Sequence, residues 1–192
     1  MIIHDISQEV FGSAIFPGDA APTKRTLLSL DKEIPDICQL SEITLGSHTG
    51  THMDAPRHFY KDGKCIDQID LDKCVGMCKV VEADGVITVD EMDDLLKDGT
   101  QRILIKGNIE ITIDVAKILT HRKIKCIGVE GLTIGPLSAP KEVHLELLGQ
   151  EIVMIEGLRL ADVKPGKYIL AAQPLKLGGL DGSPLRAILM EE

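Results

Sequence analysis

Short apolar runs rich in Val and Ile alternate along the chain with longer amphipathic stretches, and Gly, Pro and Asp residues separate them. This alternation predicts a mixed α/β fold, because strands need short apolar runs whereas helices need an apolar stripe that repeats about every 3.6 residues. The pattern has no fixed internal period. At 192 residues the chain is the size of one ordinary domain, so we expect a single compact domain spanning residues 1–192.

The middle of the chain predicts strands and helices in alternation, as in βαβ units. The expected elements are strand 75–83, helix 88–97, strand 102–106, helix 113–121, strand 124–129, helix 139–148 and strand 152–155. Thr88 and Glu91 have the spacing of a capping box at the start of the first helix. Pro140 suits the first turn of the third helix and Gly149 its C-terminal cap, so we expect that helix to end before Gly149.

The two ends of the chain predict further strands. Residues 41–47 alternate polar and apolar side chains, as a half-buried strand does. Residues 167–177 and 184–190 predict an antiparallel pair of strands joined by the glycine-rich turn 178–182.

The charge balance excludes several classes of partner. Acidic residues outnumber basic ones by 30 to 21, and the formal net charge of −9 repels phosphate backbones and anionic lipid. No apolar run reaches the roughly 18 residues of a membrane helix, and the N-terminus lacks the layout of a signal peptide. We therefore expect a cytoplasmic protein that binds neither nucleic acid nor membranes.

Sequence motifs for several other kinds of chemistry are missing. The five cysteines never have C-x-x-C spacing, so neither a disulfide framework nor a zinc ribbon is indicated. The chain also lacks a G-x-S-x-G elbow, a phosphate-binding G-K-[ST] loop and a G-x-G-x-x-G fingerprint. Serine-hydrolase, nucleotide-binding and nicotinamide-dependent functions therefore lose their main support.

A dense group of potential metal ligands lies within residues 48–58. Three of the six histidines and one aspartate occur there: His48, His52, Asp54 and His58. If the chain is extended through this segment, the period of two places the first three of these side chains on one face. Gly50 would then leave room for an ion on that face. Pro56 should end the strand, so that His58 lies on a loop or first helical turn just beyond it.

A His/His/Asp set favours zinc, manganese or ferrous iron, because imidazole suits first-row transition metals and a carboxylate adds charge. Calcium prefers oxygen ligands and is a poor match. The alternative is that these are surface or hydrogen-bonded histidines in a polar loop. The metal site is the favoured interpretation, because unrelated histidines rarely gather in so short a segment.

The same segment carries a complete signature of the form H-x-G-T-H-x-D-x-P-x-H. Its fixed positions are His48, Gly50, Thr51, His52, Asp54, Pro56 and His58. The segment resembles the metal-dependent cyclase family, which includes bacterial kynurenine formamidase (arylformamidase) and isatin hydrolase. The likeness extends from the opening residues 4–7 and the turn 17–19 to the closing residues 181–187. It implies that residues 1–192 form a cyclase-like metal-dependent hydrolase domain with the family's swivelling β/β/α fold.

The resemblance also implies a centre of one or two divalent ions, with zinc expected first and manganese as the alternative. His48, His52 and Asp54 would bind one ion, and Asp54 can bridge to a second. Family members take further ligands from a helical histidine and from a glutamate about twelve residues later, and His144 and Glu156 lie at that separation. The family usually forms homodimers or larger assemblies, so we expect a dimer or tetramer.

The implied activity is hydrolysis of an amide or related acyl bond in a small-molecule substrate. A bound divalent ion lowers the pKa of its water towards neutrality, and the resulting hydroxide attacks the carbonyl carbon. His58 is the expected catalytic acid/base, because a histidine pKa near about 6.5 lets it accept a proton and return it to the leaving group.

Three interpretations of the substrate stay open. The substrate is an N-formyl arylamine, as for kynurenine formamidase, or a lactam, lactone or polyketide-like molecule, or the protein binds metal without catalysis. His58 argues against the last, because a pure binding site needs no base beyond its ligands. Phe16 stands where family formamidases commonly place a bulky aromatic, and the chain has no tryptophan. Glu130 stands in a stretch that usually differs in formamidases, and it either faces the pocket or lies exposed at a strand end.

Overall fold

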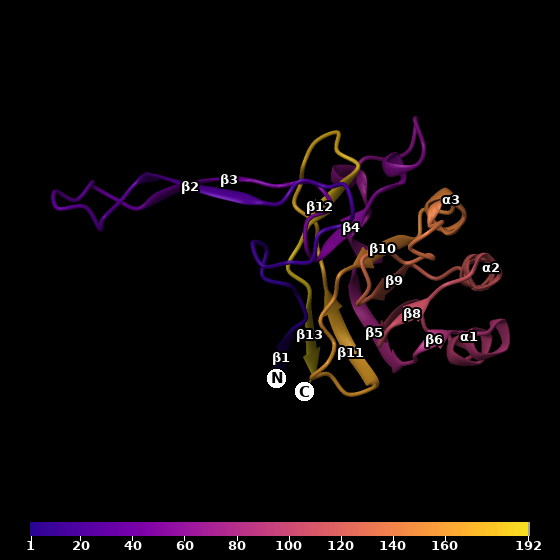
Figure 1. Cartoon of the computed structure of the whole chain (residues 1–192). Coiled ribbons are helices and arrows are strands. Elements are labelled where there is room, and N and C mark those ends of the chain that lie inside the picture. The colour runs from indigo at the N-terminus through magenta and orange to yellow at the C-terminus, as the bar shows by residue number, and fades with distance from the viewer. Residues whose placement is uncertain (192) are drawn as a thin grey trace.

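The computed structural model of the chain describes residues 1–191. Within them, a curved mixed sheet of nine strands forms the body of the molecule (Figure 1). In spatial order its strands are β1 (Ile2–Asp5), β13 (Ile188–Glu191), β11 (Gly166–Ala171), β5 (Val75–Glu82), β7 (Arg102–Lys106), β9 (Cys126–Val129), β10 (Val153–Glu156), β4 (His52–Asp54) and β12 (Gly182–Pro184). The central strands β5, β7, β9 and β10 are parallel, and every other pairing within this sheet is antiparallel. The predicted mixed α/β fold is therefore confirmed.

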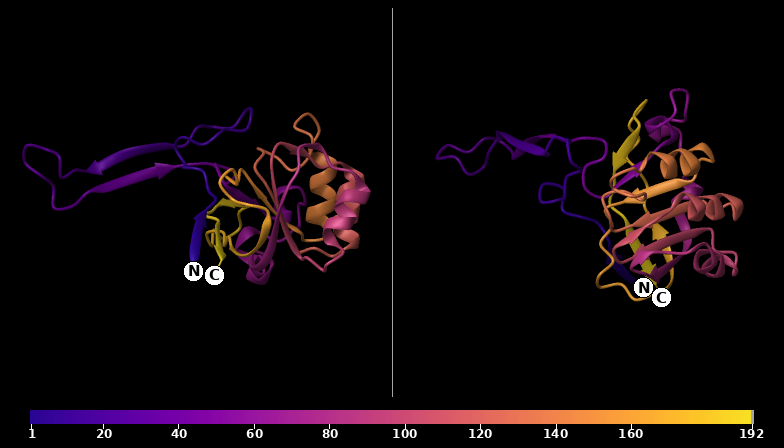
Figure 2. Two further views of the ribbon diagram at one scale, coloured as in Figure 1. Left: turned by 90° about the horizontal axis from the view of Figure 1, so that it is seen from below. Right: turned by 45° about the vertical axis from the view of Figure 1, so that its right-hand side comes forward.

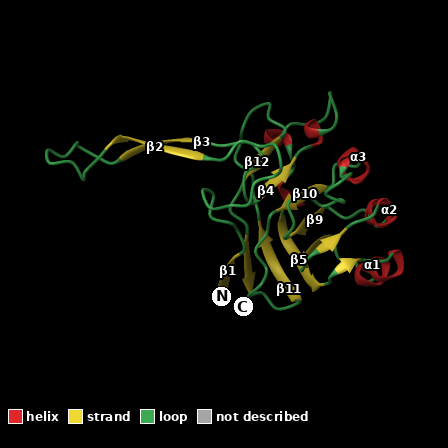
Figure 3. Cartoon of the chain, in the orientation of Figure 1, coloured by secondary structure: helices red, strands yellow, loops and turns green. Residues whose placement is uncertain are grey.

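Three helices connect the parallel strands and cover one face of the sheet (Figures 1 and 3). They are α1 (Val89–Leu96), α2 (Ile113–His121) and α3 (Lys141–Gly149). The predicted capping box at α1 is confirmed, since Thr88 Oγ1 accepts from the Glu91 amide and the Glu91 carboxylate accepts from the Thr88 amide. The predicted cap at Gly149 is wrong, because Gly149 belongs to the last turn of α3 and the left-handed residue after the helix is Glu151, with φ of 54°.

The central strands are buried on both faces, which explains their nearly continuous apolar sequences. On β7, Ile103 and Ile105 pack under the helices, whereas Leu104 points into the core on the opposite face. That second core lies on the face of the sheet opposite the helices, and Met53, Ile155 and other buried apolar side chains form it. Figure 2 shows the curve of the sheet.

The predicted C-terminal strand pair is present but shorter than expected. β11 ends at Ala171 and pairs antiparallel with β13. The chain then returns along the sheet edge and adds β12 beside β4, a pairing that the sequence pattern did not predict.

A long hairpin projects away from the body of the molecule (Figures 1 and 2). It consists of β2 (Thr23–Leu28) and β3 (Leu40–Thr44), which pair antiparallel and are exposed along nearly their whole length. The strand predicted at 41–47 ends at Thr44, because the chain turns where the Thr49 amide donates to the Gly46 carbonyl.

The remaining elements are short. They are β6 (Gly85–Val86), β8 (Ile109–Glu110) and the 3₁₀ helices η1 (Pro56–His58), η2 (Ile66–Gln68) and η3 (Leu71–Lys73). No helix among residues 1–191 is long and apolar enough to cross a membrane.

Candidate active site and metal centre

Strands β4 and β10 bring together three of the predicted ligands. Their register places Glu156 opposite His52 and Met154 opposite Asp54. Because cross-strand partners share a face and alternate residues repeat it, His52, Asp54 and Glu156 all point toward the helical layer. All three side chains are buried.

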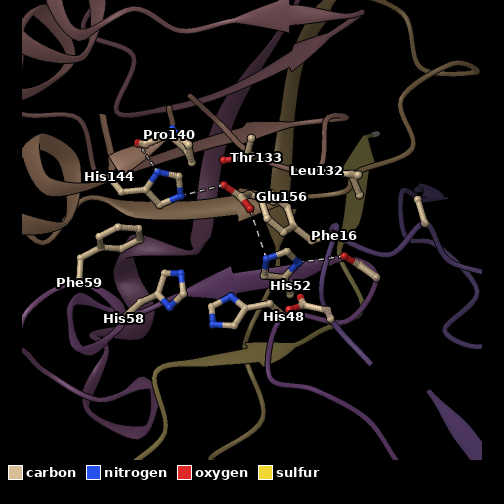
Figure 4. Close-up of a pocket in the computed structure, with 13 residues that line it drawn as sticks. Phe16, His48, His52, His58, Phe59, Leu132, Thr133, Pro140, His144 and Glu156 are labelled. Atoms are coloured by element: carbon tan, nitrogen blue, oxygen red, sulfur yellow. Dashed lines mark hydrogen bonds and ion pairs between the residues drawn. The ribbon is translucent and has the colours of Figure 1, made fainter. Parts of the chain in front are cut away.

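Helix α3 supplies the fourth predicted ligand from above this face. His144 lies on the buried side of the helix with Val143, Leu147 and Leu148. Its Nδ1 hydrogen bonds to the Pro140 carbonyl at 2.8 Å, so Nδ1 carries the proton and Nε2 is turned toward the strands (Figure 4). His52 is held in the same way, with Nδ1 2.9 Å from the Gly50 carbonyl.

The two imidazoles and two carboxylates form a closed box. His52 Nε2 lies 3.5 Å from Asp54 Oδ1 and 3.3 Å from Glu156 Oε2. His144 Nε2 lies 3.6 Å from Asp54 Oδ2 and 3.4 Å from Glu156 Oε1. Each carboxylate thus presents one oxygen to each histidine, an arrangement that suits one ion or a bridged pair.

The box fits a divalent transition metal. Ligand atoms about 2.0–2.2 Å from a tetrahedral ion lie roughly 3.3–3.6 Å from one another, and the spacings in the box are of this size. Asp54 Oδ2 is buried and accepts no hydrogen bond from residues 1–191, so a ligand is needed to compensate its charge. Carbonyl acceptors behind both imidazoles are the usual support for histidine ligands.

His48 reaches the site by a different route from the predicted one. The segment is not extended, because His48 lies in a turn and Gly50 has a left-handed φ of 67°. Its ring still faces the site, with Nδ1 2.9 Å from Asp54 Oδ1. The proposed role of Gly50 is also wrong: a Cβ there would meet Ser13 at 3.3 Å rather than the ligands. Gly50 is needed for a backbone turn that aims its carbonyl at His52.

The charges of the site shift its titrations. Burial alone would lower the pKa of His48, but Asp54 and Asp181 outweigh it and raise the pKa to about 9. Burial also lowers the pKa of His52 and His144, but the neighbouring carboxylates outweigh it, so both pKa values are raised. Burial would raise the pKa of Asp54, but the surrounding imidazoles hold it far below its usual range. Asp54 is thus ionised, as metal ligation requires, and the imidazoles must release protons when an ion binds.

His58 lies beside the box rather than in it. It occupies the 3₁₀ turn η1 after Pro56, as the sequence predicted. Its ring stacks against His48 with centroids 4.1 Å apart and contacts Phe59 edge-on. Burial, with the charge of His48, lowers the pKa of His58, so its neutral form prevails at neutral pH.

Asp181 is the site residue that sequence reasoning did not single out. Its Oδ2 lies 3.0 Å from His48 Nε2 and 3.2 Å from His58 Nδ1. The next residue must be glycine, because a Cβ at Gly182 would come within 2.7 Å of the His48 ring. One feature of the sequence could have indicated Asp181 as a site residue, because Asp181 and Gly182 lie in the closing segment 181–187 that resembles the family.

A cavity of about 290 Å³ opens beside these side chains (Figure 4). Phe16, Phe59 and Leu132 supply its apolar walls, and Thr133 borders it with a buried hydroxyl that has no hydrogen-bond partner among residues 1–191. Glu130 does not face the cavity. Its carboxylate accepts hydrogen bonds from the backbone amides of Gly107 and Leu160, at 2.7 and 2.8 Å, and so connects two loops.

The chain is similar to known proteins over most of its length. The model of the Cyclase family matches residues 4–136. The chain is 31% identical to the kynurenine formamidase of Salinibacter ruber, over 100% of this chain and 98% of that protein. It is 32% identical to the kynurenine formamidase of Bacillus cytotoxicus, with 96% and 95% covered.

Solved structures show the same fold. A potential metal-dependent hydrolase with cyclase activity superposes with a TM-score of 0.84 at 28% identity, over 100% of this chain and 99% of that one. Isatin hydrolase A from Labrenzia aggregata has a TM-score of 0.83 at 22% identity, with 98% and 93% covered. His144, Glu156 and Asp181 lie beyond the family-model match but within these longer alignments.

Proposed function

The chain belongs to the Cyclase family, and on that premise we propose that it is a metal-dependent hydrolase that cleaves the formamide bond of an N-formyl arylamine such as N-formylkynurenine. The observation that carries the proposal is the box of His52, His144 and two carboxylates next to a cavity with His58 at its edge. The kynurenine formamidases aligned over nearly the whole chain support the choice of bond.

We assign the metal to His52, Asp54, His144 and Glu156, together with His48. Zinc is the expected ion and manganese the alternative, because imidazole and carboxylate ligands suit both. When bound, the divalent ion would supply Lewis acidity that polarises the substrate carbonyl and lowers the pKa of water.

His58 is assigned the proton transfers. Its neutral ring accepts the proton of the attacking water at the nitrogen that does not face Asp181. The ring then returns this proton to the leaving nitrogen as the carbon–nitrogen bond breaks, and formate and the free arylamine result. Phe16 and Phe59 form walls against which an aromatic ring can pack.

The first test is hydrolysis of N-formylkynurenine by metal-depleted protein reloaded with zinc or manganese. We expect turnover to return with metal and His58→Ala to abolish it while metal content is kept. His121→Ala, which removes an exposed imidazole at the end of α2, is the matched control and should keep full activity. Full metal occupancy with hydrolysis of a lactam or lactone instead would identify another enzyme of the family, and failure to bind metal would overturn the proposal.

We also propose that the protein is a homo-oligomer, with a dimer as its smallest form. An isolated two-stranded hairpin is marginally stable in water, yet the β2–β3 hairpin projects from the body (Figure 1) and its apolar side chains Leu27, Leu40 and Ile43 are exposed. Ile34 and Ile37 at its tip are 85% and 97% exposed. Light scattering should find at least a dimer, and the double variant Ile34→Ser/Ile37→Ser should weaken it. Leu71→Ser, an exposed apolar position on the body, is the control.

A further inference from the structure

Asp181 connects two histidines that have different tasks. One oxygen, Oδ2, faces both His48 Nε2 and His58 Nδ1, while Oδ1 accepts from the Ser47 hydroxyl at 3.1 Å. The residue is placed by the β4–β12 pairing, in which Gly182 lies opposite Asp54. Its position is therefore set by the same strand that carries the metal ligands.

An ionised carboxylate only accepts hydrogen bonds, so each ring nitrogen that faces Asp181 must carry a proton. His58 then carries its proton on Nδ1 and keeps the Nε2 lone pair. In the metal-free protein the Nδ1 of His48, 2.9 Å from Asp54 Oδ1, also carries a proton. When an ion binds at Asp54, that proton is the one released, and His48 keeps its proton on Nε2 toward Asp181.

We propose that Asp181 is a positioning residue that imposes opposite tautomers on His48 and His58, and so holds one as a metal ligand and the other as a proton acceptor. The inference rests on the proposed function for the role of His58. The inference adds to the proposed function a role for a residue outside the signature segment, and it couples the metal ligand His48 to the acid/base His58 through one oxygen atom.

The loop itself does not depend on the Asp181 side chain. The Ala55 amide donates to the Asp181 carbonyl, the Ile66 amide donates to the Leu180 carbonyl, and Asp67 accepts from the Gly179 amide at 3.0 Å. Removing the Asp181 charge should therefore leave the loop in place. Asp67→Asn is a matched control, because it removes the charge of a carboxylate in η2 that contacts the same loop without touching an imidazole.

The test compares zinc-loaded wild type, Asp181→Asn and Asp67→Asn. Long-range ¹H–¹⁵N spectra of protein labelled at histidine report each tautomer directly. Wild type should show His58 protonated on Nδ1 only, and Asp181→Asn should lose this preference. We expect zinc content to stay within about twofold in Asp181→Asn, kcat to fall about 100-fold and KM to change less than about threefold. Asp67→Asn should match wild type in all four measurements.

Several outcomes would overturn the inference. Wild-type His58 protonated on Nε2 would do so without any variant, as would unchanged kcat and tautomers in Asp181→Asn. Loss of an ion in Asp181→Asn would make Asp181 a metal ligand, since it also forms a potential three-residue site with His48 and His58. An equal fall in kcat in Asp67→Asn would mean that Asp181 only helps to hold the loop in place. If wild type does not hydrolyse N-formylkynurenine, the proposed function fails, and the tautomer spectra still decide the role of Asp181.

Discussion

His144 Nε2 lies 3.6 Å from Asp54 Oδ2, an oxygen that is buried and receives no hydrogen bond from residues 1–191. Helix α3 and strand β4, which are far apart in the sequence, thus place an imidazole nitrogen and a carboxylate oxygen without a hydrogen bond next to each other. The oxygen has no hydrogen-bond partner among these residues, and a cation bound between it and the His144 nitrogen would compensate its charge.

Replacing Asp54 by asparagine should abolish the metal site. The amide removes the charge and places a hydrogen-bond donor among ligand nitrogens, so we expect less than about a tenth of the wild-type zinc after dialysis. Elemental analysis of the purified protein gives the measurement. Asp162→Asn, which changes an exposed carboxylate, should keep full zinc. Wild-type zinc content in Asp54→Asn would remove Asp54 from the ligand set.

The metal-free protein should lose stability as pH rises from about 6.5 to 9. The pKa of His48 is raised from 6.5 to about 9 in the folded protein, so its contribution is complete below 6.5 and is lost as the ring deprotonates. His52 and His144 shift in the same direction. Thermal melting across this range measures the effect, and His48→Gln should flatten it. A melting temperature that climbs with pH in the metal-free protein would contradict the prediction.

Thr133→Val should separate stability from substrate binding. The variant replaces a buried hydroxyl without a partner by a methyl group of similar shape, so the free protein should gain up to about 1 kcal/mol in its free energy of unfolding. If substrate hydrogen bonds to this hydroxyl, KM should rise about fivefold or more while kcat changes little. A less stable variant with unchanged KM would mean that the hydroxyl already has a partner.

Gly50→Ala should weaken metal binding through backbone geometry. A left-handed φ costs a residue with a Cβ about 1–2 kcal/mol, and the shifted carbonyl would loosen His52. Zinc affinity should fall about 10–100-fold, measured with a competing chelator. Gly99→Ala is the control, because its φ of 79° brings the same strain with no atom within 4 Å of the new Cβ. Equal affinities in the two variants would show that the Gly50 carbonyl does not support the ligand.

The sequence alone determined the local features of this protein. The capping box at Thr88 and Glu91, the alternation on β7 and the helices of the βαβ units depend on neighbours close in the chain, and so their patterns can be read locally. The eleven residues from His48 to His58 likewise contain a cluster of histidines and an aspartate that is visible in the sequence without the fold.

Tertiary structure decided how those residues meet. The register that sets Glu156 beside His52, the approach of His144 from α3 and the position of Asp181 depend on pairings between distant segments. A pattern of polar and apolar residues specifies which face of a strand is buried, but it does not specify the neighbouring strand. Gly50 shows the same limit, because next to its left-handed turn the Thr51 hydroxyl donates to the carbonyl of Gly157, a residue far away in the sequence.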